Sequence, residues 1–526
     1  MAGLVLSFCT VYNTGMFART RSAATIGIDA YVVDVEVNIA SQGYKDSTIV
    51  GLPDAAVKES WQRVRLALRN SELPHSEHTT VINLAPAHTR KEGPSFDLPM
   101  AVGIMAASDA LDGDLWQKLL FVGELSLDGK LRHVNGVLPI ALMAERKGFA
   151  GIVLPRSNAA EAALVENLKV YPAGTLEQVY QFLNGDFVIE PHPPAGPEVW
   201  NARPNYGVDF GDVKGQEAAK RAMEIAAAGN HNIIMVGPPG SGKTMLARRL
   251  STILPNLSRE ECLEVTKLYS IKGLLRGGDD VIRTRPFRSP HHTISNIALI
   301  GGGTMPKPGE VSLAHYGVLF LDELPEYKRD VLEVLRQPLE DGTVSIARAA
   351  QSLTFPASFI LVGAMNPCPC GWMGDYVREC TCAPNQIQNY LKKISGPLLD
   401  RIDIHVDVPR LEPEKLSSNP TGESSESIRA RTQAARERQL ARYRDEHIFS
   451  NGELGGRLLR KYCALPRDAE DTLMLAIKTF GFTARAYDRI RKLARTIADL
   501  AGVESITQSH IAEAIQLRSL DRKYWG

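Results

Sequence analysis

The sequence predicts an α/β protein organised around one glycine-rich loop. Residues 237–244 spell Gly-Pro-Pro-Gly-Ser-Gly-Lys-Thr, which fits the phosphate-loop pattern of a glycine, four free positions and Gly-Lys-Thr. The apolar run at 232–236 predicts a strand before this loop, and residues 245–253 predict a helix after it. Two further apolar runs, 316–321 and 359–365, predict buried strands that each end at a polar residue. This order favours a nucleotide site over a glycine-rich turn that matches by chance.

Length and composition indicate several soluble domains. The chain has 526 residues, of which 44% are apolar and 23% are charged, so two to four domains are expected. Lys+Arg and Asp+Glu both number 60, which excludes a global basic field, and any DNA contact must come from local basic patches. No apolar run reaches the ~20 residues needed to span a bilayer. We expect a cytoplasmic protein without a membrane partner.

The first half of the chain divides into an extension, an α+β domain and a linker. Residues 1–15 are apolar but lack the basic start of a signal peptide, so we expect residues 1–24 to be an extension without fixed structure, with Met16 as an alternative start. Residues 25–190 alternate between the two kinds of element, with strands predicted at 31–39, 79–84, 121–126 and 151–154 and helices at 53–70, 96–107 and 138–147. Residues 191–204 contain five prolines, which predicts a linker over 191–206.

The residues of the predicted nucleotide site have expected roles. Glycines let the loop N–H groups face phosphates at a helix N-terminus, so the cofactor-binding residues are Gly237, Pro238, Pro239, Gly240, Ser241, Gly242, Lys243 and Thr244. Lys243 is expected to reach the β/γ-phosphates of ATP, and Thr244 and Asp322 to hold Mg²⁺. Glu323 is the candidate base that polarises the attacking water, and Asn366, at the end of the next strand, can orient that water.

Two arginines further along the chain complete a pattern that resembles AAA+ ATPases. Residues 395–401 read Ser-Gly-Pro-Leu-Leu-Asp-Arg and end at Arg401, whereas Gly-Phe-Thr-Ala-Arg-Ala at 481–486 places Arg485 at the start of a predicted helix. The resemblance implies that Asn366 is sensor 1, Arg401 the arginine finger and Arg485 sensor 2. A finger that serves a neighbour's phosphate implies a ring of subunits. The alternative for each arginine is an ordinary surface ion pair.

Four of the seven cysteines crowd into one stretch, at Cys368, Cys370, Cys380 and Cys382. Two Cys-x-Cys pairs across a glycine-containing loop can supply four thiolates to a tetrahedral Zn²⁺. The spacing is tighter than the usual Cys-x₂-Cys. The alternative is a set of reduced thiols without metal, which would oxidise readily if exposed. We expect Zn²⁺.

Local basic residues supply the candidate DNA contacts. Residues 343–346 and 352–355 predict a hairpin whose tip, 347–351, carries Arg348. An insertion that begins at residue 286 contributes Arg288, His291 and His292. The arginine-rich helix predicted at 427–447 is as consistent with a solvated face as with DNA contact.

The first domain resembles the proteolytic domain of Lon-type proteases, on the sequences at 91–96, 123–130 and 148–155. The resemblance implies a nucleophile at Ser95 and a lysine base that falls on or near Leu138; Lys130 and Lys147 lie well away from that position. A serine without a base within hydrogen-bond reach is a poor nucleophile, so we expect a non-proteolytic scaffold in which Ser95 starts a helix.

Together these features resemble one family, the magnesium-chelatase-like AAA+ ATPases called YifB or ComM, in the magnesium-chelatase/MCM branch. The resemblance covers nearly the whole chain from Thr25. It implies a Lon-like (ChlI-type) domain over 25–190, an AAA+ core over 207–410 and a helical lid over 411–526. It also implies a homo-hexamer that hydrolyses ATP to move single-stranded or branched DNA in natural transformation, a branch-migration helicase with recombination proteins as partners. The alternatives are a chelatase-type remodelling motor and a Lon-like protease.

Overall fold

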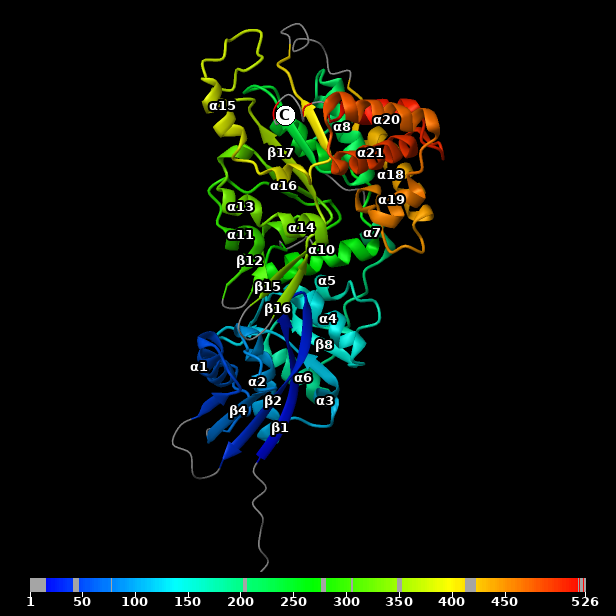
Figure 1. The fold of residues 1–526 in the computed structure, drawn as a ribbon. Coiled ribbons are helices and arrows are strands. Elements are labelled where there is room, and N and C mark those ends of the chain that lie inside the picture. Colours follow the sequence, from blue (N-terminus) through cyan, green and yellow to red (C-terminus); the bar gives the residue numbers. More distant parts are fainter. Residues whose placement is uncertain are drawn as a thin grey trace, which may run out of the picture. The chain divides into compact units, whose positions relative to one another are not determined.

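The computed structural model describes residues 16–40, 47–76, 78–201, 206–275, 281–303, 306–347, 352–411, 422–518, 520 and 524. The chain divides into two compact units (Figure 1). The first comprises Met1–Asn201 with Tyr269–Val281, and the second comprises Ala202–Leu268 with Ile282–Gly526. Among the described residues, none of the helices combines the length and the apolar character needed to cross a bilayer.

The first unit is built on a mixed sheet with the strand order β1-β2-β4-β3. Its strands are β1 (Met16–Ile26), β2 (Asp29–Ala40), β3 (Thr48–Val50) and β4 (Thr79–Ala85). The alternating apolar residues of β2 all point into the core, at Val33, Val35, Val37 and Ile39. Helix α2 (Asp97–Ala107) packs on β1 and β2, and it approaches so closely that a methyl group on Gly103 would lie 2.7 Å from Val37 Cγ2.

The expected N-terminal extension is wrong from Met16 onward, because residues 16–24 belong to β1. This strand pairs with β2 in antiparallel register over its whole length, from Met16 opposite Ile39 to Ile26 opposite Asp29. The buried positions of β1 hold Ala18, Thr20 and Ser22, which alternate with exposed residues. Small and polar side chains in the buried row leave no apolar alternation to indicate a strand, which is why the sequence pattern missed it.

The remainder of the first unit confirms the predicted strand 151–154 and helix 138–147, while the predicted strand 121–126 is divided between two short strands. The elements are α1 (Ala55–Asn70), α3 (Leu115–Lys118), β5 (Leu119–Phe121), β6 (Glu124–Leu125), β7 (Leu131–Arg132), α4 (Val137–Arg146), β8 (Gly151–Pro155), α5 (Ala159–Ala162), β9 (Val170–Ala173), α6 (Leu176–Asn184) and α7 (Pro197–Asn201). Strands β5, β8 and β9 form a parallel sheet, and β6 pairs with β7 as a hairpin. Helix α7 lies inside the expected linker.

The second unit contains a five-stranded, fully parallel sheet with the order β11-β14-β17-β10-β18. Its strands are β11 (Phe287–Arg288), β14 (Val318–Leu321), β17 (Ile360–Met365), β10 (Ile233–Val236) and β18 (Ile404–Asp407). Both faces are covered: Ile233 and Met235 enter one hydrophobic core, whereas Ile234 and Val236 enter another. Parallel strands buried on both faces have continuous apolar runs, which explains why the sequence predicted them.

Helices surround this sheet, and the predicted helices near the phosphate loop are confirmed. They are α8 (Glu217–Gly229), α9 (Lys243–Ile253), α10 (Arg259–Lys272), α11 (Asn296–Ile300), α12 (Glu310–Leu313), α13 (Arg329–Glu333), α14 (Arg336–Asp341), α15 (Pro384–Leu391) and α16 (Gly396–Leu399). Two antiparallel hairpins are present, β12 (Gly301–Gly302) with β13 (Lys307–Pro308), and β15 (Thr343–Ala347) with β16 (Ser352–Pro356). The second is the predicted hairpin; its tip, with Arg348, lies outside the described residues.

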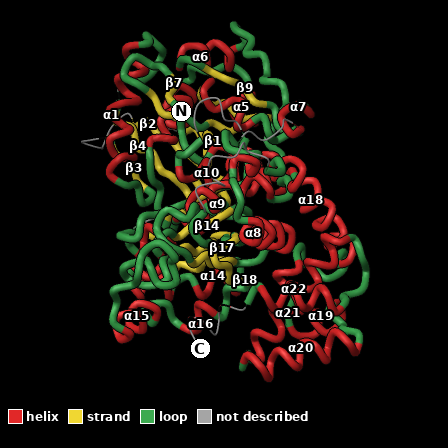
Figure 2. The backbone as a smooth tube through the Cα atoms, turned by 90° about the horizontal axis from the view of Figure 1, so that it is seen from above, coloured by secondary structure: helices red, strands yellow, loops and turns green. Residues whose placement is uncertain are grey.

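The C-terminal region is helical, as predicted, and gathers at one side of the second unit (Figure 2). It comprises α18 (Ser425–Arg442), α19 (Gly456–Tyr462), α20 (Arg467–Phe480), α21 (Ala484–Ala501) and α22 (Gln508–Gln516). Leu473, Ile490 and Ile511 share one hydrophobic core with a face of the parallel sheet. The helices and the sheet therefore pack as one body.

A buried carboxylate adds a polar tie between the sheet and α21. Asp403, just before β18, pairs with Arg489 of α21, accepts a hydrogen bond from the Asn232 N–H at 3.2 Å and lies 3.4 Å from His231 Nδ1. Burial alone would raise the pKa of Asp403, but Arg489 and His231 outweigh burial and hold this pKa below its usual range. Removing one partner of such a buried pair typically costs about 3–5 kcal/mol.

Candidate nucleotide and metal sites

The phosphate loop lies at the carboxyl edge of the parallel sheet, between β10 and α9. Two of its glycines are required by the backbone. A methyl group on Gly237 would lie 2.1 Å from the Val408 carbonyl oxygen, and Gly242 turns the chain into α9 with a φ of 94°. The loop can therefore lie this close to the end of β18 only with glycine at the first position.

Lys243 points back into the loop from the first turn of α9. Its ammonium donates hydrogen bonds to the carbonyls of Gly237 (2.7 Å) and Pro238 (2.9 Å) and to Asn366 Oδ1 (3.3 Å). Burial lowers the pKa of Lys243 to about 8, although the charges of Asp322 and Glu323 oppose this shift. The structure thus brings the lysine, the loop and the end of β17 together, as the sequence predicted.

Oxygen ligands suited to Mg²⁺ lie beside the lysine. The Thr244 hydroxyl donates to Asp322 Oδ2 at 2.8 Å, and Asp322 Oδ1 accepts from the Glu323 N–H at 3.0 Å. A hydroxyl and a carboxylate are hard donors of the kind that Mg²⁺ binds together with phosphate oxygens. Glu323 adopts the left-handed conformation, with a φ of 52°, and its side chain is 60% exposed. This geometry directs the candidate base away from the strand and toward solvent.

His292, a predicted DNA contact, lies beside Glu323; its contact with DNA stays a prediction. Its Nδ1 is 3.8 Å from Glu323 Oε2. The Tyr327 hydroxyl donates a hydrogen bond to the Pro290 carbonyl at 2.6 Å. This bond holds the turn that carries His291 and His292 near the carboxyl edge of the sheet. The His291 ring packs on the His292 ring, with centroids 4.1 Å apart, and His291 Nδ1 makes a hydrogen bond with Thr293. The spacing of His292 and Glu323 in the sequence does not predict that they meet, because the insertion between them folds back toward the end of β14.

Arg288 is also placed differently from the expectation of a free DNA contact. Its guanidinium forms a bidentate ion pair with the Glu310 carboxylate, at 2.7 and 2.8 Å. A paired arginine offers little net charge to a phosphate backbone. The sequence could not indicate this pair, since 22 positions separate its members.

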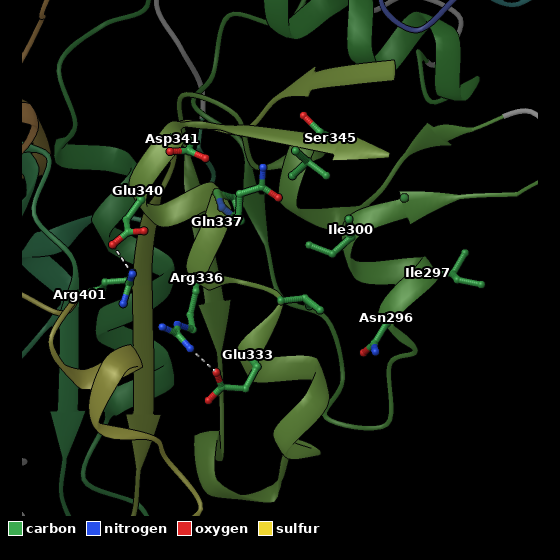
Figure 3. A pocket seen from close by; sticks show the side chains of 14 residues that line it. Asn296, Ile297, Ile300, Glu333, Arg336, Gln337, Glu340, Asp341, Ser345 and Arg401 are labelled. Atoms are coloured by element: carbon green, nitrogen blue, oxygen red, sulfur yellow. Dashed lines mark hydrogen bonds and ion pairs between the residues drawn. The ribbon is translucent and has the colours of Figure 1, made fainter. Parts of the chain in front are cut away.

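Arg401 and Arg485 lie away from the phosphate loop of their own chain. Arg401 precedes β18, and because β18 runs parallel to β10, this arginine is at the amino edge of the sheet, opposite the phosphate loop. It donates to the Pro397 carbonyl at 2.6 Å and pairs with Glu340 in a pocket of about 590 Å³, where Arg336 pairs with Glu333 (Figure 3). Arg485 pairs with Asp400, the residue before Arg401.

The four clustered cysteines converge in space. Their sulfur atoms all lie within 4.8 Å of one another, with Cys368, Cys370 and Cys380 separated by 3.3–3.6 Å. Zn–S bonds of 2.3 Å place the sulfurs of a tetrahedral site about 3.8 Å apart, so this donor set fits Zn²⁺. Burial and the neighbouring Cys370 thiol raise the pKa of Cys368 to about 12. For Cys370, burial is outweighed by the N–H groups of Trp372 and Thr381, and its pKa falls to about 6.

In the first unit, the serine and the lysines weighed for the expected Lon-like site lie on separate elements. Ser95 lies in a short 3-10 turn (Pro94–Phe96) before α2, and Leu138 is buried in α4. Lys130 forms an exposed ion pair with Asp128 at 2.8 Å, and Lys147 ends α4 at the surface. The non-proteolytic interpretation stays a prediction.

Comparison with known proteins identifies the family of this chain. Residues 209–416 match the family described as magnesium chelatase, subunit ChlI. Residues 35–158 match subunit ChlI of Mg-chelatase, and residues 422–518 match the magnesium chelatase subunit ChlI C-terminal family. Competence protein ComM of Haemophilus influenzae is 44% identical, with 96% of this chain and 98% of ComM covered.

The chain belongs to the YifB/ComM family of magnesium-chelatase-like proteins. YifB of Escherichia coli is 42% identical over 95% of this chain and 97% of its own length. The magnesium-chelatase 67 kDa subunit of Chlorobaculum tepidum is 29% identical over 30% of this chain and 23% of its own length. Membership of this family suggests ATPase activity with ATP and Mg²⁺ as ligands.

The contact between His292 and Glu323 generates a prediction. Replacing His292 with alanine removes the neighbour that restrains an otherwise exposed carboxylate, so we expect His292→Ala to lower the ATP turnover number severalfold with little change in KM. His291→Ala is the comparison variant: it removes the ring that packs on His292 but leaves His292 itself, so it should lower turnover less than His292→Ala does. Equal kinetic effects of the two substitutions would remove His292 from this positioning role.

Proposed function

We propose that this protein is an ATP-driven motor that acts on DNA as a homo-hexameric ring, with helicase or branch-migration activity in natural transformation and recombination. The observation that carries the proposal is the convergence of Lys243, Thr244, Asp322 and Asn366 at one edge of the parallel sheet. These groups can bind ATP with Mg²⁺, and Glu323 beside them can activate water. The name of the Haemophilus relative, competence protein, favours DNA as the substrate.

The positions of the two arginines support the proposed ring. Arg485 pairs with Asp400, the residue that precedes Arg401. The two arginines are thus both at the edge of the sheet opposite the phosphate loop. An arginine there can stabilise a γ-phosphate only on a neighbouring subunit. Both are held by carboxylates that a phosphate could replace. In such a ring the hairpin β15–β16 is our candidate for the DNA-gripping element, with Arg348 at its tip.

A chelatase-type remodelling motor is the second candidate, favoured by the magnesium-chelatase families that match all three regions of the chain. A remodelling motor would use the same ATP site as a DNA motor but would act on another molecule. A measurement of DNA binding distinguishes the two candidates. A Lon-like protease is a weaker third, since it requires a base for Ser95.

The first test compares wild-type protein with Lys243→Ala and Glu323→Gln. Glu323→Gln should still bind ATP but lose about 10²–10⁴-fold in turnover, because it removes the general base, whereas Lys243→Ala should lose ATP binding as well. Phosphate release and strand displacement on forked DNA are the measurements. Glu326→Gln makes the same chemical change three residues away, in an exposed pair with Lys393, and should be silent.

Three outcomes would contradict parts of this proposal. Wild-type turnover in Glu323→Gln would show that another group is the base. ATP hydrolysis without DNA binding would exclude the DNA motor and favour the remodelling motor. A wild-type protein that fails to bind ATP would overturn the proposed function altogether.

The ring generates a separate prediction. Arg401→Ala and Lys243→Ala subunits should each be inactive alone, yet mixtures should recover part of the ATP hydrolysis, because some mixed interfaces pair an intact phosphate loop with an intact finger. ATP turnover is measured across a series of mixing ratios, with mass photometry to show that mixed rings form. No recovery in rings that contain both subunits would argue against action between subunits.

We also propose that the cysteine cluster binds one Zn²⁺. Purified protein should carry about one zinc per chain by elemental analysis, and Cys380→Ser should lose it, because three thiolates bind Zn²⁺ more weakly than four. Cys262→Ser is the control, since Cys262 is buried in the second unit and is not a member of the cluster. Protein purified without chelators that contains no zinc would refute this assignment.

A further inference from the structure

The loop that carries the four cysteines packs directly against the phosphate loop. This segment, residues 367–382, is here called the cysteine loop, and it begins immediately after Asn366, which accepts a hydrogen bond from Lys243. Gly371 has a φ of 84°, and a methyl group added to it would lie 2.6 Å from Pro239 Cδ and 2.8 Å from Pro239 Cγ. Gly371 therefore lies against the Pro239 ring of the phosphate loop, with no room for a side chain between them.

The cysteine loop is also attached to the chain that follows β18. The side chain of Asp375 is 1% exposed; it accepts hydrogen bonds from the N–H groups of Val377 (2.7 Å) and Arg378 (3.0 Å) and lies 3.4 Å from Arg410 Nε. The Trp372 ring has the guanidinium groups of Arg378 and Arg410 at 4.8 and 5.1 Å from its centroid. These cation–π and ionic contacts fix the loop between the phosphate loop and the end of β18.

The cysteine loop has little regular backbone structure of its own. All of residues 367–382 are described, and they contain neither helix nor strand. Two backbone hydrogen bonds, Gly371 N–H to Cys368 O and Asp375 N–H to Trp372 O, form local turns. The four sulfur atoms, all within 4.8 Å of one another, join the two ends of the loop. In a short irregular segment, the free energy of metal binding is also the free energy that orders the chain.

We propose that the cysteine loop is a metal-dependent support of the phosphate loop, so that Zn²⁺ binding and ATP binding strengthen each other. The inference rests on the proposed ATP-binding function. With its four thiolates bound to one ion, the loop presses Gly371 against Pro239 and holds Asn366 toward Lys243. Because coupling between two sites is reciprocal, ATP must raise the affinity for zinc by the same factor by which zinc raises the affinity for ATP. Couplings of this kind typically change affinity by about 5- to 150-fold.

Two glycines of the cysteine loop provide a matched pair of variants. Gly371 and Gly374 have nearly the same left-handed φ, 84° and 80°, so alanine introduces similar backbone strain at both. They differ in surroundings, because a methyl group on Gly374 meets no atom within 4 Å. We expect Gly371→Ala to weaken binding of a fluorescent ATP analogue with Mg²⁺ at least about fivefold. Gly374→Ala should bind the analogue like wild type, and both should keep their zinc.

The reciprocal experiment measures the zinc affinity of wild-type protein by equilibrium competition with a chromogenic zinc chelator. Saturating non-hydrolysable ATP analogue should raise this affinity severalfold in wild type, and the effect should disappear in Gly371→Ala. Equal ATP affinity of the two glycine variants, or a zinc affinity of wild type that is the same with and without the analogue, would overturn the inference. Both results require that wild type binds ATP, whereas a wild type that binds no ATP would refute the proposed function itself. If Gly371→Ala loses zinc, the competition experiment on wild type decides.

Discussion

The parallel pairing of β14, β17 and β10 is the constraint on which the candidate site depends. Parallel strands end at the same edge of a sheet, so the residues that follow them meet although they are far apart in the sequence. Asp322 follows β14, Asn366 follows β17, and the phosphate loop follows β10. The hydrogen bonds of Lys243 to Asn366 and of Thr244 to Asp322 then join the ends of these strands in one site. This arrangement requires glycine at position 237, because the loop passes against the end of β18.

The same strand direction separates the two kinds of charge in the second unit. Groups suited to bind a nucleotide are at the carboxyl edge, whereas the two arginines suited to sense its γ-phosphate are at the amino edge, each neutralised by an acid. Asp403 ties this amino edge to α21, and the shared hydrophobic core ties α21 to the sheet. The C-terminal helices are therefore joined to the arginine-bearing edge by both an ion pair and apolar packing.

Much of the second unit could be predicted from the sequence because its signals are local. The phosphate loop has a fixed spacing, and the strands of a doubly covered parallel sheet are uninterrupted apolar runs. What escaped prediction depends on contacts between distant residues. Arg288 with Glu310 and His292 with Glu323 are examples in which a basic residue meets an acid that no spacing rule identifies. Strand β1 escaped for a different reason, because its buried row consists of small and hydroxyl side chains that contribute no hydrophobic pattern.

The carboxylate that holds Arg401 has a consequence for the proposed ring. Glu340 neutralises the guanidinium within the chain, so in that ring the binding of Arg401 to a neighbour's nucleotide would exchange one anion for another and create no new charge pair. The net electrostatic free energy of such an exchange is the difference between two similar terms, each with its own desolvation cost. The charge of the nucleotide, which changes when the γ-phosphate departs, would then decide whether Arg401 binds the nucleotide or Glu340. At each interface of the proposed ring, the arginine would thereby distinguish nucleotides by their charge, because Glu340 of its own chain is a competing anion of constant charge.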